Sequence, residues 1–236
     1  MICIILAGGL GTRLAEETQH KPKPLVTIGG KPIIWHIMMI YSSQGYSNFL
    51  IAGGYKINML EPEIKKSLGS NSKITFDVLD TGLNTSTGGR IKRCIEYSGE
   101  NRFLATYGDG VGDIKLSRLI SIHERENAIA TLTAVRPPAR FGRVVLEGNK
   151  VINFGEKNQA DEGWINGGFF VLEREVSNLI SGDEMPLEHF PLNHLAQVGK
   201  LRAMKHEGFW QPMDTLREKQ DLEALWQINQ APWKIW

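Results

Sequence analysis

The chain begins with the apolar stretch Met1-Ile-Cys-Ile-Ile-Leu-Ala7, which runs directly into Gly8-Gly-Leu-Gly-Thr-Arg-Leu14. An apolar run of this length that ends in glycines is typical of a buried parallel strand entering a tight turn. Glycine has no Cβ, so the backbone N–H groups of such a turn can approach an anion closely. Arg13 adds a delocalised cation suited to phosphate oxygens, and a helix after the turn would point the positive end of its dipole at them. The stretch therefore predicts a cradle for a polyphosphate.

The residues around these glycines do not fit two familiar phosphate-binding motifs. A P-loop needs a Gly-Lys pair followed by Ser or Thr, whereas the two pairs in this chain continue as Gly30-Lys-Pro32 and Gly199-Lys-Leu201. A dinucleotide-binding fingerprint, as in a nicotinamide dehydrogenase, needs a third glycine where Leu14 stands. A plain strand-to-helix turn without a ligand is the remaining alternative, and Arg13 and Lys23 count against it.

The composition is that of an ordinary globular protein, and 236 residues are enough for one sizeable α/β domain. A net charge of +1 provides no basic surface for nucleic acid or an anionic membrane, so neither is expected as a partner. Cys3 and Cys94 lie in apolar patterns without metal-ligand spacing or a disulfide framework, as expected for a reducing compartment. The N-terminal apolar run is too short to span a bilayer and lacks a basic leader. A cytoplasmic location is therefore expected.

Strand-like and helix-like patterns alternate along the first half of the chain, which predicts βαβ units and a parallel sheet. Strands are expected at 1–7, 49–52, 74–79 and 103–107, and helices at 32–45, 61–68 and 87–97. The second half predicts helices at 116–126, 188–198 and 216–229, strands at 128–135, 164–172 and 201–205, and a hairpin over 143–154. We expect one domain over 1–236, with a nucleotide-binding half at about 1–110 and an acceptor-binding half at about 111–236.

The segment Lys21-Pro-Lys-Pro24 holds two ammonium groups on a stretch stiffened by prolines. Proline fixes φ and favours an extended residue before it, so neither lysine is expected in a helix. The segment follows the glycine turn closely enough to cover the same phosphates. A solvated basic turn is the alternative.

Aspartates at predicted strand ends and in an apolar loop are candidates for a metal site. Asp109 follows a buried strand between two glycines, at the edge where open α/β sheets bind ligands. Asp214 ends the segment Gly208-Phe-Trp-Gln-Pro-Met-Asp214, which is too apolar for a plain surface loop. Mg²⁺ is typically held by one or two carboxylates and completes its shell with phosphates and water. Asp80 also ends a strand, but a turn-forming role explains it better, and helix caps or solvated loops are the alternatives for single aspartates.

Polar residues also gather where the predicted hairpin ends. Glu156-Lys157 closes the hairpin, and Asn166-Gly-Gly168 interrupts the strand that follows. A lysine at this position can meet a phosphate monoester, while Glu156 and Asn166 can bind sugar hydroxyls. A surface ion pair explains Glu156-Lys157 equally well.

Together these motifs resemble the signature of the sugar-phosphate nucleotidyltransferases, and within them the glucose-1-phosphate cytidylyltransferases. The opening part of the resemblance, Leu6-Ala-Gly-Gly-Leu-Gly-Thr-Arg-Leu14 with Lys21-Pro-Lys-Pro24, is shared by the whole superfamily. The stretch Ile28-Gly-Gly-Lys-Pro-Ile-Ile-Trp-His-Ile-Met38 and the segment Gly208-Phe-Trp-Gln-Pro-Met-Asp-Thr-Leu-Arg217 are similar to the branch that uses CTP. Further motifs extend the resemblance over nearly the whole chain: Glu16-Glu-Thr18, Asp80-Thr-Gly82, Thr87-Gly-Gly-Arg90, Tyr107-Gly-Asp-Gly110, Arg140-Phe-Gly142, Trp164-Ile-Asn-Gly-Gly-Phe-Phe170 and Ala231-Pro-Trp-Lys234.

The resemblance implies an α/β fold: a Rossmann-like, mostly parallel sheet flanked by helices, with a smaller mixed β/α sugar-binding half. It implies a homo-oligomeric enzyme that makes CDP-glucose and pyrophosphate from CTP and α-D-glucose 1-phosphate with Mg²⁺, as a precursor of deoxysugars of surface polysaccharide. The implied nucleotide-binding residues are Leu6, Ala7, Gly8, Gly9, Gly11, Thr12, Arg13, Lys23, Asp80, Thr81, Gly88 and Gly89. The implied substrate-binding residues are Tyr107, Gly108, Glu156, Lys157, Asn166 and Gly167. Asp109 and Asp214 would bind Mg²⁺, and Arg13, Lys23 and Asp109 would be the catalytic residues.

The chain departs from the family pattern in two places. The family carries a longer segment between the strands ending near Phe76 and Asp80, which bears on oligomer contacts and the base pocket. The family also tends to have proline where Asn158 stands, which bears on the acceptor. The open alternatives are UTP or dTTP as the nucleotide, another phosphorylated acceptor, or a noncatalytic nucleotide-binding regulatory subunit.

Overall fold

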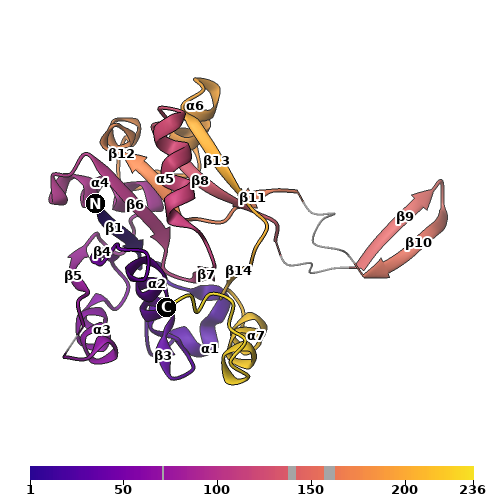
Figure 1. Ribbon diagram of the computed structural model, residues 1–236, viewed down its shortest axis with the longest axis horizontal. Coiled ribbons are helices and arrows are strands. Elements are labelled where there is room, and N and C mark those ends of the chain that lie inside the picture. The colour runs from indigo at the N-terminus through magenta and orange to yellow at the C-terminus, as the bar shows by residue number, and fades with distance from the viewer. Residues whose placement is uncertain (71, 138–141, 157–162) are drawn as a thin grey trace.

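The computed structural model of the protein describes residues 1–70, 72–137, 142–156 and 163–236 (Figure 1). The helices are α1 (Ala15–Thr18), α2 (Ile33–Ser42), α3 (Leu60–Leu68), α4 (Thr87–Ser98), α5 (Leu116–Arg125), α6 (Phe190–Gln197) and α7 (Leu216–Gln227). The strands are β1 (Ile2–Leu6), β2 (Thr27–Ile28), β3 (Lys31–Pro32), β4 (Asn48–Gly53), β5 (Thr75–Asp80), β6 (Arg102–Tyr107), β7 (Gly110–Gly112), β8 (Ala130–Val135), β9 (Gly142–Glu147), β10 (Lys150–Glu156), β11 (Ile165–Asn166), β12 (Phe170–Glu173), β13 (Leu201–His206) and β14 (Trp210–Pro212). Short 3₁₀ helices lie at Thr12–Leu14, Lys23–Leu25, Ile57–Met59 and Arg174–Leu179. Among these helices, none has both the length and the apolar composition needed to cross a membrane.

A central sheet organises the molecule, with the strand order β11-β8-β12-β6-β1-β4-β5 and with β13 paired to β8. β1 lies between β4 and β6 and pairs in parallel with both, and β5 extends the parallel array beyond β4. β12 runs antiparallel between β6 and β8, so the second part of the sheet is mixed. The predicted α/β class with a mostly parallel sheet is confirmed. Because the chain leaves β1 for β4 on one side and later forms β6 on the other, the end of β1 is a topological switch point, where such sheets bind ligands.

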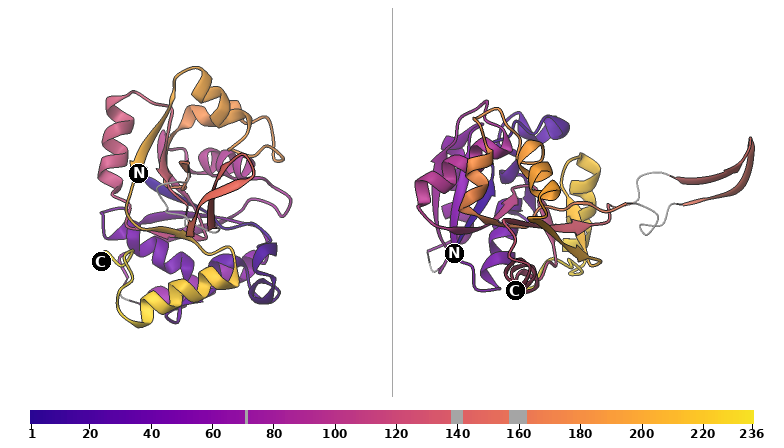
Figure 2. Two further views of the ribbon diagram at one scale, coloured as in Figure 1. Left: turned by 90° about the vertical axis from the view of Figure 1, so that its right-hand side faces the viewer. Right: turned by 90° about the horizontal axis from the view of Figure 1, so that it is seen from above.

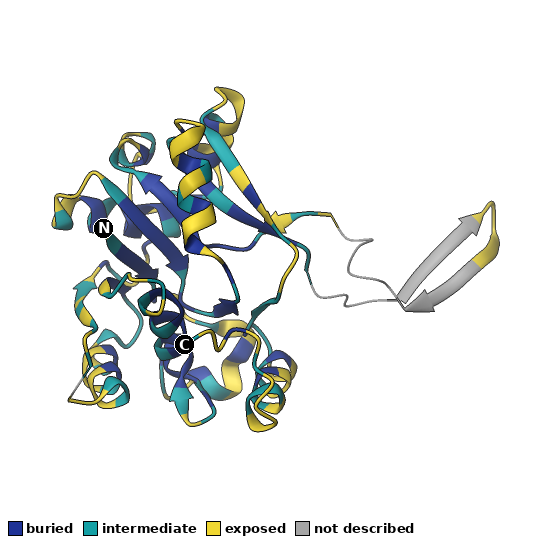
Figure 3. Cartoon of the chain, viewed as in Figure 1, coloured by how far each residue is buried: buried dark blue, intermediate teal, exposed yellow. Residues whose placement is uncertain are grey.

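Helices cover both faces of this sheet (Figure 2). Cys3 and Ile5 of β1 join a buried cluster with α2, α3 and α5 on one face, whereas Ile4 joins a cluster with α4 and α6 on the other. Burial on both faces explains why β1 has a continuous apolar sequence instead of an alternating one. The strands of the central sheet are mostly buried, and the outer sides of the helices are exposed (Figure 3).

The helix expected after the glycine turn is much shorter than a phosphate-binding helix usually is. The turn continues into the 3₁₀ helix Thr12–Leu14 and the four-residue α1, with Gly11 in the left-handed region at φ +67°. The helix cannot continue far because Pro22 and Pro24 follow, and Pro22 holds extended backbone with ψ 149°. The predicted helix-dipole contribution is therefore small, and any anion binding at this turn depends on the loop N–H groups and side-chain cations.

The C-terminal part of the chain returns to its N-terminal part, and α7 packs against the β2–β3 hairpin (Figure 1). Thr215 begins α7 with a capping box, in which the Glu218 carboxylate accepts hydrogen bonds from the backbone N–H groups of Asp214 and Thr215. An ion pair between Lys219 and Glu17 joins α7 to α1. This packing fixes the loop that carries Asp214.

His36 of α2 lies fully buried among the tryptophans of the C-terminal segment. The indole N–H of Trp233 donates to Nδ1 of His36 (3.3 Å), so Nε2 carries the proton and donates to the Ile28 carbonyl oxygen (2.9 Å). Burial lowers the pKa of His36 from 6.5 to about 4, although the hydrogen bond to Ile28 and the nearby Glu223 oppose this shift. The ring is therefore neutral in the folded protein at neutral pH.

We expect the free energy of unfolding to fall by about 3 kcal/mol between pH 6.5 and pH 4 because of His36. The unfolded chain binds a proton at this residue below pH 6.5, whereas the folded chain does so only near pH 4, so acid favours the unfolded state. Urea unfolding of the wild type and of His36→Gln at several pH values in this window measures the effect. All other titrating groups are common to both proteins. Parallel curves of the free energy of unfolding against pH for the two proteins would therefore contradict the prediction.

Candidate active site

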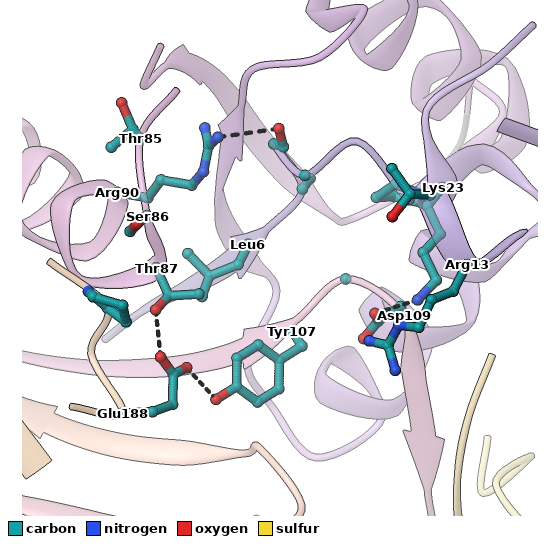
Figure 4. Close-up of a pocket in the computed structure, with 18 residues that line it drawn as sticks. Leu6, Arg13, Lys23, Thr85, Ser86, Thr87, Arg90, Tyr107, Asp109 and Glu188 are labelled. Atoms are coloured by element: carbon teal, nitrogen blue, oxygen red, sulfur yellow. Dashed lines mark hydrogen bonds and ion pairs between the residues drawn. The ribbon is translucent and has the colours of Figure 1, made fainter. Parts of the chain in front are cut away.

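A cavity of about 450 Å³ opens at the carboxyl ends of β1 and β6, at the switch point of the sheet (Figure 4). Its lining includes nearly all of the predicted residues from the glycine turn, the Lys23 segment and the end of β6. These lining residues are Leu6, Ala7, Gly8, Gly9, Gly11, Thr12, Arg13, Lys23, Tyr107, Gly108 and Asp109. The rest of the wall is formed by Pro24, Thr85, Ser86, Thr87, Arg90, Pro186 and Glu188.

A cluster of opposite charges occupies one end of this cavity. The Nζ atom of Lys23 lies 2.6 Å from Oδ2 of Asp109 and 2.6 Å from Oδ1 of Asp214. Arg13 contacts the other oxygen of Asp214, with 2.6 Å between its guanidinium and Oδ2. The four residues come from three distant parts of the sequence, and the structure brings the two predicted metal-binding aspartates to one point.

Local hydrogen bonds explain why the two aspartates meet. β7 follows Asp109 and pairs antiparallel with β14, which precedes Asp214. The backbone N–H of Met213 also donates to the carbonyl oxygen of Asp109 (2.7 Å). The two carboxylate-bearing loops are thus tied together by backbone hydrogen bonds.

The two lysines of the Lys21–Pro24 segment have different surroundings. Lys23 is nearly buried and faces the aspartates, whereas Lys21 points away and lies 3.5 Å from the Glu17 carboxylate. The extended backbone of Pro22 separates them. Only Lys23 is therefore in a position to contact a ligand in the cavity.

The carboxylates of Asp109 and Asp214 form a donor set that suits Mg²⁺. Both contact the same ammonium group, so their oxygens converge on a small volume next to the glycine turn. Across the described residues there is no group of three or more His, Cys, Asp or Glu side chains arranged to hold a metal ion. A magnesium ion held here would complete its shell with ligand phosphates and water, as this ion commonly does.

Four predicted nucleotide-binding residues are not among the residues that line the cavity. The Thr81 side chain is fully buried and donates to the Gly53 carbonyl oxygen (2.6 Å), while Asp80 is exposed and accepts from the N–H of Gly82 (2.9 Å). Gly88 and Gly89 are buried in the first turn of α4, where a Cβ on Gly88 would lie 2.5 Å from the carbonyl oxygen of Met185. The cavity wall in this region is formed by Thr85, Ser86 and Thr87 instead.

Arg90 of α4 links several segments around the site by hydrogen bonds, and the sequence did not indicate this role. Its guanidinium is buried and donates to the Thr81 hydroxyl and to backbone carbonyl oxygens at the ends of three strands, β1, β4 and β5; these are the carbonyl oxygens of Gly8, Gly53, Gly82 and Leu83. A Cβ on Gly8 would collide with this guanidinium. The first glycine of the turn is thus needed for Arg90 to approach, and Arg90 joins the glycine turn to the loop after β5.

The structure describes some of the residues that are predicted to bind the acceptor. Asn166 donates from Nδ2 to the hydroxyl of Tyr107 (2.9 Å), and this hydroxyl donates to Oε1 of Glu188 (2.5 Å). Burial, and then the Glu188 carboxylate, raises the pKa of Tyr107 well above its usual range, so the phenol keeps its proton. Gly167 lies next to this network, and its carbonyl oxygen accepts from the Trp210 indole (2.8 Å). Lys157 and the side chain of Glu156 lie outside the described residues.

Comparison with known proteins shows which family the chain belongs to. A model of the nucleotidyl transferase family matches residues 2–207. The chain belongs to the nucleotidyl transferase family. Within this family it is 46% identical over 256 aligned positions to the glucose-1-phosphate cytidylyltransferases of Salmonella typhi and of Salmonella typhimurium, and each alignment covers 100% of both chains. The crystal structure of HddC from Yersinia pseudotuberculosis has the same fold, with a TM-score of 0.72 at 23% identity over 95% of this chain and 99% of that one.

The cavity suits the chemistry of a nucleotidyl transferase. A glycine turn offers backbone N–H groups, and Arg13 and Lys23 offer cations, so the cluster end can hold a polyphosphate. The opposite end is formed by hydroxyl groups, Pro186, the Glu188 carboxylate and Arg90, whose guanidinium already donates to the Thr81 hydroxyl and to backbone carbonyl oxygens. An elongated ligand with phosphates at one end and an uncharged group at the other fits this distribution of charge.

Proposed function

We propose that this nucleotidyl transferase forms CDP-glucose and pyrophosphate from CTP and α-D-glucose 1-phosphate. The main support from the structure is the Lys23–Asp109–Asp214 cluster, which lies beside the glycine turn at the switch point of the sheet. The choice of CTP and glucose 1-phosphate rests on the full-length identity of 46% to enzymes named glucose-1-phosphate cytidylyltransferase.

The reaction requires no general base, because the phosphate oxygen of the acceptor is already an anion near pH 7. The barrier arises from bringing this anion up to the α-phosphate of the nucleotide, which is also negative. Catalysis then consists of in-line positioning and charge neutralisation by groups that are already in place. Arg13 and Lys23 supply two of these charges, and Lys23 is held at the cavity end by its two carboxylate partners.

We propose Mg²⁺ as the metal, held by Asp109 and Asp214 together with nucleotide phosphates. When bound, the ion would neutralise phosphate charge and help to orient the α-phosphate. Asp109 is fixed by its position after β6, and Asp214 by the capping box of α7. These two constraints keep both carboxylates against the ammonium group of Lys23.

On the acceptor side we propose that Tyr107, Gly108, Asn166 and Gly167 bind the sugar phosphate together with Glu156 and Lys157. The network between Asn166 and Tyr107 supports this assignment.

We infer one domain over 1–236, with a nucleotide-binding half at about 1–110 that binds CTP and an acceptor-binding half at about 111–236 that binds the sugar phosphate. A cytoplasmic homo-oligomer is part of the same proposal, supported by the family resemblance and by the free, buried thiols of Cys3 and Cys94.

Pyrophosphate release from the purified protein tests the proposed function. CTP, UTP, dTTP and GTP are each combined with glucose 1-phosphate, and CTP is also combined with mannose 1-phosphate and galactose 1-phosphate. CTP with glucose 1-phosphate is expected to give the highest kcat/KM, excess EDTA to abolish release, and added Mg²⁺ to restore it. A higher kcat/KM with another pair would replace the proposed substrates. Absence of a nucleotide sugar with every pair would instead indicate a noncatalytic nucleotide-binding protein.

A further inference from the structure

One wall of the cavity is formed by a segment that the sequence analysis did not connect with the site. Residues 183–188 pass over the first turn of α4 and bring Pro186 and Glu188 into the cavity lining. The backbone N–H of Ser86 donates to the Asp183 carbonyl oxygen (2.7 Å), and the Arg93 guanidinium binds both carboxylate oxygens of Asp183. Segment 183–188 is thus held firmly against the start of α4.

The Glu188 carboxylate has a defined position in this wall. Its Oε2 atom accepts from the hydroxyl of Thr87 (2.6 Å), and its Oε1 atom accepts from the hydroxyl of Tyr107 (2.5 Å) (Figure 4). The Thr87 hydroxyl is itself held by the backbone N–H of Leu187 (2.9 Å). No ion pair to a cation is present at Glu188 in the described part of the chain. Each carboxylate oxygen keeps a lone pair for a further donor.

Glu188 lies at the opposite end of the cavity from the phosphate-binding charges. Arg13, Lys23 and Asp109 gather on one side of Leu6, whereas Thr87 and Glu188 lie on the other (Figure 4). A nucleoside triphosphate whose phosphates contact Arg13 and Lys23 therefore directs its base toward the Thr87 and Glu188 end. An ionised carboxylate at that end can accept hydrogen bonds but cannot donate them.

Pyrimidine bases differ in the group that they present to such an acceptor. Cytosine carries an exocyclic amine, which donates, where uracil and thymine carry a carbonyl oxygen, which only accepts. Placing a carbonyl oxygen against a carboxylate leaves both acceptors without a partner, and a buried polar group without a partner is costly. A site built to pair with a donor therefore rejects a ligand that lacks it.

We propose that Glu188 is a specificity-determining residue that selects cytosine nucleotides over uracil and thymine nucleotides by accepting a hydrogen bond from the exocyclic amine. This inference rests on the proposed function and names the group that selects the base. Thr87 and Tyr107 act as positioning residues, because their hydroxyl groups orient the carboxylate.

The test compares kcat/KM for CTP and for UTP, both with glucose 1-phosphate, in the wild type and in Glu188→Gln. A glutamine amide can donate to the carbonyl oxygen of uracil, so the CTP-to-UTP ratio is expected to fall by about tenfold or more. Glu184→Gln is the matched control: it makes the same change of side chain within segment 183–188, but Glu184 is exposed and is not among the residues that line the cavity, so its ratio is expected to stay within about twofold of the wild type. An equal loss for both nucleotides in Glu188→Gln, with the ratio preserved, would overturn the inference.

Two further measurements keep the inference testable if Glu188→Gln does not fold, as judged by circular dichroism. Glu188→Asp keeps an acceptor and is expected to retain a preference for CTP, so loss of that preference would count against the inference. The wild type is also expected to use the triphosphate of 2-pyrimidinone riboside, which lacks the amine, at least about tenfold less well than CTP; equal use would overturn the inference. A wild type that forms no nucleotide sugar with any nucleotide would refute the proposed function itself, which is a distinct outcome.

Discussion

Replacing Lys23 with alanine is expected to lower kcat by about 10²-fold or more. The ammonium group of Lys23 lies between Asp109 and Asp214, at the end of the cavity where the α-phosphate and the attacking phosphate must approach each other. Loss of one group that stabilises developing charge in a preorganised site typically lowers turnover by about 10² to 10³. Steady-state pyrophosphate release at saturating Mg²⁺, CTP and glucose 1-phosphate measures the effect. Saturating Mg²⁺ ensures that the two carboxylates are not left facing each other without a cation.

Lys21→Ala is the matched control for this experiment. Lys21 has the same charge and lies two residues away in the same segment, but its side chain is directed to Glu17. Its replacement is expected to leave kcat within about twofold of the wild type. Thermal unfolding of both variants separates a catalytic effect from a folding defect. A Lys23→Ala protein that turns over at a rate close to that of the wild type, or an equal loss in both variants, would remove Lys23 from the mechanism.

The part of the site that could be predicted from the sequence is the part encoded by local signals. The apolar run of β1 and the glycines after it identify a buried strand and a close turn without reference to any other residue. The position of Asp109 can be predicted for the same reason, because it follows a strand whose central residues, Phe103–Ala105, are apolar and buried. The position of Asp214 relative to Asp109 depends on the pairing of β7 with β14, two three-residue strands that are too short to have a pattern of their own.

The opposite wall of the cavity depends on contacts that no local pattern encodes. Glu188 lies in a loop with ordinary composition, and its role follows only from its contacts with Thr87 and Tyr107 in distant elements. Arg90 did carry a signal: it is four residues before Cys94, and Ile91, Cys94 and Ile95 form the buried face of α4. The charged group of a side chain at the edge of an apolar helix face can extend into water, or it can be buried if several protein acceptors bind it. The choice between them requires the carbonyl groups of the glycine turn, which the helix sequence does not show.

Replacing Arg90 with methionine is expected to lower the free energy of unfolding by about 4 kcal/mol. Methionine fills much of the same volume, so the loss comes mainly from the hydrogen bonds that the guanidinium donates to carbonyl oxygens such as those of Gly8 and Gly82. Burial lowers the pKa of Arg90, but the ordinary value for arginine is so high that the group stays charged and pairs with these carbonyl dipoles. Urea unfolding followed by circular dichroism measures the effect.

Arg93→Met on the same helix provides the comparison that isolates burial. Arg93 also forms short charged hydrogen bonds, to Asp183, but the side chains of both residues are nearly half exposed, so Asp183 remains hydrated when the pair is broken. An exposed ion pair typically contributes 1 kcal/mol or less, so Arg93→Met is expected to change the free energy of unfolding by about that amount. The two variants remove the same charge and nearly the same side-chain volume from one helix, and they differ in whether the acceptors left behind can reach water. If both lose the same free energy, the carbonyl groups around Arg90 are hydrated without it, and the glycine turn is held in place by its own backbone.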